Sequence, residues 1–265
     1  MGSPLTIASY ILVGFVVGTC TAFSGVGAGA LMTPMLVLVM GVDANVAIGS
    51  DLLFNLGTKV VAVFTHMRRR TIQPKLLLWL CVGGVPGAIA GVLASAWLRH
   101  HLDLAALEHF LRILLGIALL VSAVSIAFGK GLVTDVSRMQ QMGAVPRGRL
   151  IVIGAFVGIL VSLTSIGSGS LTLPLLLLAL PGVAIVALVG TDIAFSVALL
   201  IPSLIGHWRI GDVNPVLSAW LLVGSVPGVL LGTYLATRLH PKWFRTGLTI
   251  VLAIVAVRLL WPTSH

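Results

Sequence analysis

Residues 15–34 read FVVGTCTAFSGVGAGALMTP, and residues 156–174 return the same pattern as FVGILVSLTSIGSGSLTLP. Two further stretches recur downstream in the same order: GSDLLF at 49–54 with GTDIAF at 190–195, and WLCVGGVPGAIAG at 79–91 with WLLVGSVPGVLLG at 220–232. Matching residues lie 140 or 141 positions apart. Such a duplication in an apolar chain is typical of membrane proteins built from two related halves, whose substrate sites tend to lie between the halves.

The composition is that of a membrane protein. Of the 265 residues, 58% are hydrophobic and 9% are charged, and the mean hydropathy is +1.14. The charges gather in short clusters between apolar stretches of about 20 residues or more, the length that an α-helix needs to cross a bilayer. The net charge of +9 does not indicate nucleic-acid binding, because basic residues at segment ends orient membrane proteins. We expect an all-α, polytopic membrane protein that contacts lipid and no nucleic acid.

Hydropathy divides each half into four apolar segments. They cover residues 5–40, 44–65, 73–98 and 106–129, and then 148–180, 184–206, 214–238 and 243–262. The opening segment of each half is too long for one crossing, because about 20 residues suffice. Each also has a glycine-serine stretch at its middle, and glycine clusters break helices. We therefore predict that each half consists of a broken, re-entrant helical hairpin followed by three transmembrane helices.

The basic loops predict how the halves are oriented. Basic residues cluster in three places: 68–75, 130–149 and 238–245. All three clusters share one side of the membrane if each opening segment enters and returns, and the positive-inside rule makes that side cytoplasmic. Both termini are then extracytoplasmic and the two repeats are inverted. The predicted organisation is a first membrane repeat at 1–129, a cytoplasmic linker at 130–147 and a second membrane repeat at 148–265.

The paired glycine-serine loops are the first candidate substrate site. A half-helix that begins near Gly27 or Gly167 exposes unpaired backbone N–H groups and the positive end of its dipole. Broken membrane helices use such ends to hold anionic substrates. An alternative is that small residues only let helices pack closely. The candidate residues are Ser24, Gly25, Gly27, Gly29, Ser165, Gly167, Ser168 and Gly169.

Polar residues inside the second segment of each half are the second candidate. Asp51, Asn55 and Lys59 follow one another at four-residue intervals, which puts them along one helical face. Ionisable groups at membrane depth are costly and mark functional sites. Lys59 either attracts an anion or neutralises Asp51. Asp192 matches Asp51 in the second half, and we consider it a candidate for coupling to a proton or sodium ion.

His66 and His207 occupy equivalent positions at the ends of these segments. They are either interfacial hydrogen-bonding residues or proton-linked gate residues. The adjacent His100 and His101 have no third ligand at metal spacing. We therefore predict no metal site and no cofactor.

These residues resemble those of a known family. The glycine-rich loops ending in Pro34 and Pro174, the GSDLLFNLGTK run with its GTD echo, and the paired VPG segments are similar to the sulfite exporter TauE/SafE family. The resemblance covers nearly the whole chain. It implies a multi-pass protein of the bacterial inner membrane that moves sulfite, sulfonates or related sulfur-containing anions, commonly outward. The T-K pair at 58–59 matches part of the family, and the second half lacks it.

The leading hypothesis is secondary transport of a small anion by alternating access. We expect a transporter rather than an enzyme, and this architecture is compatible with an oligomer. A passive anion channel is the first alternative. A second alternative is an intramembrane aspartyl protease that uses Asp51 and Asp192 as a dyad. This second alternative is disfavoured because the GSD and GTD runs lack the second glycine of a GxGD signature.

Overall fold

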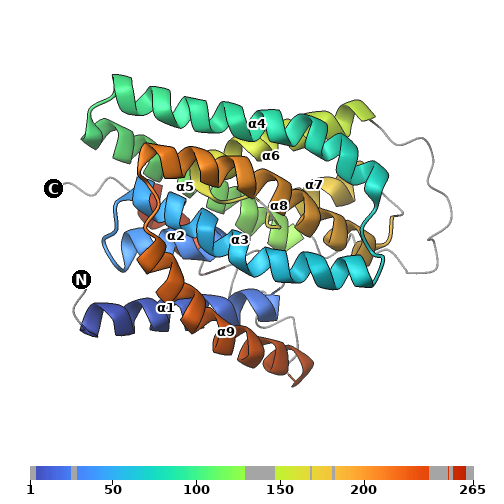
Figure 1. Ribbon diagram of the computed structural model, residues 1–265, viewed down its shortest axis with the longest axis horizontal. Coiled ribbons are helices and arrows are strands. Elements are labelled where there is room, and N and C mark those ends of the chain that lie inside the picture. Colours follow the sequence, from blue (N-terminus) through green and yellow to red (C-terminus); the bar gives the residue numbers. More distant parts are fainter. Residues whose placement is uncertain are drawn as a thin grey trace.

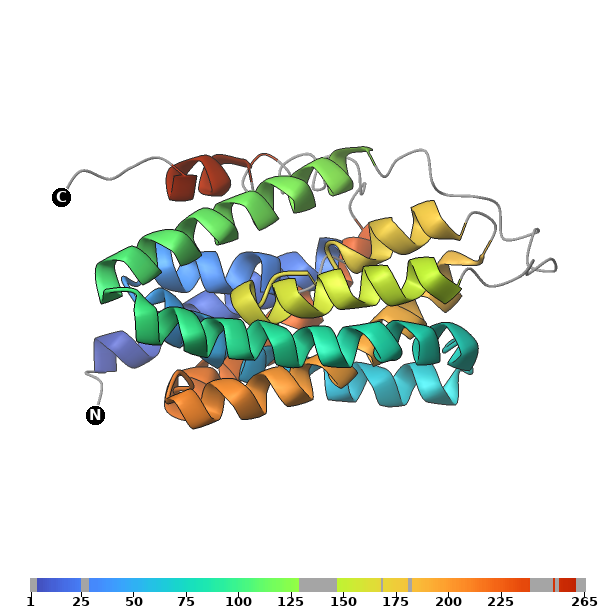
Figure 2. The same cartoon turned by 90° about the horizontal axis from the view of Figure 1, so that it is seen from above.

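A computed structural model describes residues 4–24, 29–128, 147–167, 169–180, 183–238, 250 and 253–260 (Figures 1 and 2). The described residues are helical apart from short connections, which confirms the all-α prediction. The helices are α1 (Pro4–Ser24), α2 (Gly29–Leu38), α3 (Ala44–Arg68), α4 (Pro74–His101), α5 (Leu104–Phe128), α6 (Arg147–Thr164), α7 (Thr172–Ala179), α8 (Ile185–Ile210) and α9 (Pro215–Arg238). Most of the predicted linker lies outside the described residues.

Five of these helices are long and apolar enough to cross a membrane. They lie within α3, α4, α6, α8 and α9, and apolar stretches of α1 and α5 are shorter. Large apolar side chains point outward from them, such as Val61 and Leu230, each 69% exposed. Exposed apolar surface on this scale suits contact with hydrocarbon rather than water. The chain is therefore a multi-pass membrane protein.

The opening segment of each half is interrupted near its glycine-serine stretch. In the second half, α6 ends at Thr164 and α7 begins at Thr172, with non-helical backbone between them. In the first half, α1 ends at Ser24 and α2 begins at Gly29, and residues 25–28 lie outside the described part. Non-helical backbone at membrane depth requires burial in protein or a lined cavity. The interruption in the second half, between α6 and α7, is as predicted.

The first helix of each half packs against a helix of the other half. Helices α1 and α9 form one extensive pair, and α4 and α6 form the other. In the α1–α9 pair, a Cβ on Gly224 would overlap the carbonyl oxygen of Ile11, and one on Gly228 would overlap that of Phe15. Glycine lets the two backbones approach this closely, as small residues do in membrane helix pairs.

The α4–α6 pair repeats this arrangement with equivalent residues. A Cβ on Gly83 would overlap the carbonyl oxygen of Ile151, and one on Gly154 would overlap that of Leu80. Figure 2 shows α4 lying alongside α6. Glycines in these two helix pairs therefore allow the close helix packing that small residues permit.

Helices α3 and α8 lie between these pairs and run in opposite directions (Figure 1). The loop after α3 reaches the beginning of α8, where the Gln73 backbone N–H donates to Thr191 Oγ1 over 2.9 Å. The loop after α8 reaches the beginning of α3, where the Asn214 N–H donates to Ser50 Oγ over 3.0 Å. Both partners of one bond lie 141 positions from those of the other. The contacts between α3 and α8 thus follow the sequence repeat.

Candidate functional site

Three polar side chains of α3 form a buried row between the two halves. Asp51, Asn55 and Lys59 lie on one face of the helix, and they are 0%, 1% and 9% exposed. The four-residue spacing predicted this shared face. The row faces protein rather than lipid, as costly intramembrane polar groups do.

The Asp51 carboxylate accepts hydrogen bonds at both oxygens. Thr33 Oγ1 of α2 donates to Asp51 Oδ2 over 2.6 Å. Asn55 Nδ2 donates to Asp51 Oδ1 over 2.7 Å and also to the Asp51 carbonyl oxygen over 3.1 Å. Two short bonds from neutral donors stabilise an ionised carboxylate. The sequence reasoning missed Thr33, because its bond to Asp51 depends on how α2 packs against α3.

The described part of the second glycine-serine loop, residues 165–167 and 169–171, is largely buried and has positive φ angles at three residues. Ser165 has a φ of +58°, Gly167 of +140° and Gly169 of +93°. The Gly167 carbonyl oxygen accepts bonds from the backbone N–H groups of Leu171 and Thr172, and from Thr172 Oγ1 over 3.0 Å. A left-handed serine costs on the order of 1–3 kcal/mol, and such strain gathers at functional sites. These bonds hold Gly167 against the beginning of α7.

This loop lies near both aspartates that the repeat pairs, Asp51 and Asp192. The Ser165 side chain interacts with the Asp51 carboxylate across the boundary between the halves, although it makes no well-formed hydrogen bond. The backbone N–H of Gly169 and the Thr172 side chain both lie close to the Asp192 carboxylate and favour its charged form. Each aspartate thus contacts a threonine from the short helix of its own half. The sequence reasoning also missed Thr172.

Lys59 links the two halves electrostatically. Its ammonium group interacts with Asp192 of the second half most strongly and with Asp51 of its own helix second. The sequence analysis considered only an anion or Asp51 as the partner of Lys59 and did not consider Asp192. Residue spacing within α3 could not indicate Asp192, because Lys59 and Asp192 come near each other only when α3 packs against α8.

The buried cluster has oxygen atoms without hydrogen-bond partners. Within the described residues, Asn55 Oδ1 and Asp192 Oδ1 accept no hydrogen bond, and Asp192 is 4% exposed. Such atoms are rare in folded proteins, and each requires an explanation such as a ligand, a proton or a catalytic function. These unpaired oxygen atoms make the cluster a candidate for binding a ligand or a proton.

Five predicted loop residues take no further part in this description. Gly25, Gly27 and Ser168 lie outside the described residues, and Ser24 and Gly29 are described only as the end of α1 and the beginning of α2. The structure thus brings together Asp51, Asn55, Lys59, Asp192, Ser165 and Gly169, with Gly167 in the same loop.

His207 lies in a second buried polar cluster, at the end of α8. Its Nδ1 is 3.1 Å from Asp212 Oδ2, and its Nε2 is 2.8 Å from the carbonyl oxygen of Ser162. Asp212 also forms an ion pair with Arg99 of α4. Both ring nitrogens face acceptors, so both contacts are hydrogen bonds only when the imidazole is doubly protonated. This cluster joins the ends of α4, α6 and α8.

His66 has a simpler environment at the end of α3. Its Nδ1 is 2.8 Å from Thr71 Oγ1, which donates to the His66 carbonyl oxygen over 3.2 Å. Thr71 stands where the other half has Asp212. The Thr71 hydroxyl and the His66 ring both lie against Gly190, which precedes Asp192 by two residues. The two histidines are equivalent in position, and only His207 contacts an acid.

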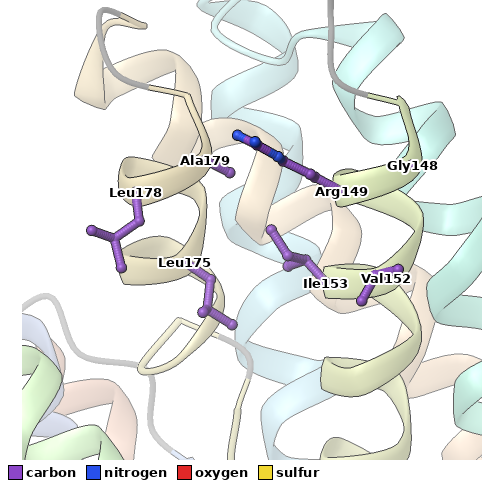
Figure 3. A pocket seen from close by; sticks show the side chains of 7 residues that line it. All are labelled: Gly148, Arg149, Val152, Ile153, Leu175, Leu178 and Ala179. Atoms are coloured by element: carbon purple, nitrogen blue, oxygen red, sulfur yellow. The ribbon is translucent and has the colours of Figure 1, made fainter.

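A groove between α6 and α7 lies apart from these clusters. It has a volume of about 460 Å³, and its lining residues are Gly148, Arg149, Val152, Ile153, Leu175, Leu178 and Ala179 (Figure 3). Arg149 is the one charged residue of this lining. The rest is apolar and offers an anion no hydrogen-bond donor from a side chain, so we do not place the substrate site here.

Comparison with known proteins places the chain in a family. Residues 10–259 match the family described as "Sulfite exporter TauE/SafE". The chain belongs to this family. It is 34% identical to the "Probable membrane transporter protein YjnA" of Bacillus subtilis (strain 168) over 259 residues, which cover 95% of this chain and 99% of that protein. No solved structure matches the chain at a significant level.

More distant relatives have names of the same kind. The chain is 27% identical to the "Probable membrane transporter protein YdhB" of the same organism over 252 residues, covering 95% of this chain and 99% of that protein. It is 24% identical to the "Probable membrane transporter protein MJ0441" of Methanocaldococcus jannaschii over 268 residues, covering 97% and 96%. The TauE/SafE chain described here is therefore a membrane transporter and not an enzyme.

Proposed function

We propose that this transporter moves a small sulfur-containing anion, such as sulfite or a sulfonate, by secondary transport. The family description supports the substrate class. The observation that carries the proposal is the position of Lys59, buried where its ammonium group faces the second half of the chain. A buried cation is costly unless it has charged partners, and a membrane lysine in the bundle interior marks a substrate or ion pathway.

The anion site lies between the two glycine-serine loops. In the second half, the donor next to Asp192 is the backbone N–H of Gly169, in the glycine-serine loop. In the first half, Ser24, Gly25, Gly27 and Gly29 contribute the matching loop. Asn55 and Lys59 lie on the α3 face that packs toward the second half.

Transport proceeds by alternating access between inverted repeats in the bacterial inner membrane. The antiparallel course of α3 and α8, and their repeat-related loop contacts, support inversion. Single cysteines that replace Arg69 and Lys242 in a cysteine-free background test the orientation. Both should react with a membrane-impermeant thiol reagent from the cytoplasmic side, and a cysteine at His101 should react from the other side. Reaction of Arg69→Cys and Lys242→Cys from opposite sides contradicts inversion.

Counterflow in proteoliposomes tests transport. Vesicles loaded with unlabelled sulfite should accumulate labelled sulfite transiently and saturably, whereas protein-free vesicles should not. A passive channel gives labelled flux without counterflow. Phosphate and nitrate serve as competitors of other chemistry, and strong competition by both with none by sulfonates contradicts the substrate class.

Lysine variants test the site itself. Lys59→Gln should lose sulfite counterflow, because it removes the buried positive charge. Lys75→Gln is the matched control, since Lys75 is an exposed lysine in the same part of the chain. Normal counterflow by Lys59→Gln contradicts a binding function for Lys59.

A further inference from the structure

The second glycine-serine loop already binds an anion, and that anion is a side chain of the protein. The Gly169 backbone N–H and the Lys59 ammonium group both favour the charged form of the Asp192 carboxylate. These are two of the groups that the proposed function gives to the substrate. Asp192 therefore occupies, as a carboxylate, the position that a substrate anion needs.

Charge also keeps a second anion out of this cluster. With Asp51, Asp192 and Lys59 all ionised, the three groups carry a net charge of −1. All three are buried, and electrostatic interactions are stronger in a medium of low dielectric constant. An incoming anion is consequently repelled unless one carboxylate first loses its charge.

The two carboxylates differ in their hydrogen-bond surroundings. Asp51 accepts short bonds from Thr33 and Asn55, one at each oxygen, so it is held as an acceptor. Asp192 has an oxygen, Oδ1, with no hydrogen-bond partner. The hydroxyl of Thr172 donates to Gly167, so its oxygen lone pairs are available to a protonated Asp192.

Building on the proposed function, we propose that protonation of Asp192 vacates the anion position and that the substrate then takes it. The proton adds to the Asp192 carboxylate, giving a neutral carboxylic acid. Lys59 and the Gly169 N–H turn to the anion, while Lys59 keeps Asp51 as its second partner. One proton and one monovalent anion bind together and cross in the same direction, which makes the transport an electroneutral symport.

Titratable groups other than Asp192 lie on the helices that pack against α8. From α3, Lys59 and Asp51 face it, and His66 approaches Gly190 through Thr71. From α6 and α7, the contacts are Gly169 and Thr172, which carry no charge. From α4, Arg99 contacts the far end of α8, where it pairs with Asp212 beside His207. A test of pH dependence must therefore separate Asp192 from His66 and His207.

The experiment compares sulfite counterflow by the wild type and Asp192→Asn as a function of pH. Protonation of sulfite itself affects both proteins equally, so their ratio reports on Asp192. The wild-type rate relative to Asp192→Asn should fall as the pH rises, by up to about tenfold per pH unit, the limit for one coupled proton. Asp43→Asn, at an exposed carboxylate before α3, should keep the wild-type profile. A constant ratio overturns the proposal.

The charge balance gives a second measurement. At mildly acidic pH, where sulfite is a monovalent anion, an imposed membrane potential should leave wild-type net flux unchanged. The same potential should drive net flux in Asp192→Asn, because that variant moves the anion without its proton. Net flux through the wild type that follows the potential, or a sodium gradient instead of a proton gradient, overturns the proposal.

Folding and function have separate readouts in this design. Counterflow by Asp192→Asn at acidic pH shows that the variant is folded. If that variant does not fold, Thr172→Val replaces it, and its pH profile should shift because the Asp192 carboxyl group loses a polar neighbour. A pH profile of Thr172→Val identical to that of the wild type contradicts the proposal. Absence of saturable exchange in the wild type refutes the proposed function, whereas exchange with a flat wild-type to Asp192→Asn ratio refutes this inference alone.

Discussion

Replacing Lys59 by methionine should destabilise the protein strongly, because it leaves two buried carboxylates without their cation. Asp51 is 0% exposed and Asp192 is 4% exposed, and Lys59 interacts with both. Breaking a buried ion pair by removing one partner costs about 3–5 kcal/mol. Because Lys59 acts on both carboxylates electrostatically rather than through a close ion pair, we expect a loss toward the lower end of that range.

The measurement is the free energy of unfolding of the purified protein in mixed micelles with increasing denaturing detergent. The control is Lys75→Met, which removes an exposed lysine and should change the unfolding free energy by less than about 0.5 kcal/mol. Equal stability of Lys59→Met and the wild type would refute the reasoning that these three groups form one electrostatic unit.

A double variant shows whether the effect runs through Asp192. Adding Asp192→Asn to Lys59→Met removes one of the two unpaired carboxylates. The double variant should be more stable than the sum of the single losses predicts, by roughly 0.5–3 kcal/mol, the usual range for residues that interact directly. Simple additivity would show that Lys59 stabilises the protein through other contacts.

Three further predictions concern packing and polar contacts away from Lys59. Gly224→Val should cost about 1–3 kcal/mol through overpacking against α1, whereas Gly148→Val, where a Cβ meets open space, should be nearly neutral in the same unfolding assay. Arg99→Met should cost about 1–3 kcal/mol, because it leaves the buried Asp212 without its guanidinium partner, and a thermal unfolding temperature equal to that of the wild type would argue against this. Thr33→Val should cost a similar amount through the lost bond to Asp51 and should slow sulfite counterflow, while unchanged stability would mean that water replaces the hydroxyl.

The sequence contained the signals that arise within one element. Four-residue spacing placed Asp51, Asn55 and Lys59 on one face, and the structure has them on that face. Glycine and serine at 165–170 predicted the interruption between α6 and α7, because such residues favour non-helical backbone. The repeat itself paired Asp51 with Asp192.

Contacts between elements were beyond sequence reasoning. The bond from Thr33 to Asp51 depends on how α2 packs against α3, and threonine in an apolar helix is an ordinary residue. The interaction of Lys59 with Asp192 depends on the antiparallel packing of α3 and α8. His207 gave no sign in the sequence that both of its ring nitrogens would face acceptors.

The exchanged pairing of α1 with α9 and of α4 with α6 has a consequence for biogenesis. A ribosome that has released only the first 146 residues has produced α1 and α4 with their glycine faces open, since both partners are still to be synthesised. The incomplete chain therefore has two unpaired helix-packing faces in the bilayer until translation finishes. Separately expressed halves should accordingly associate with each other, and each half alone should be a substrate for membrane quality-control proteases.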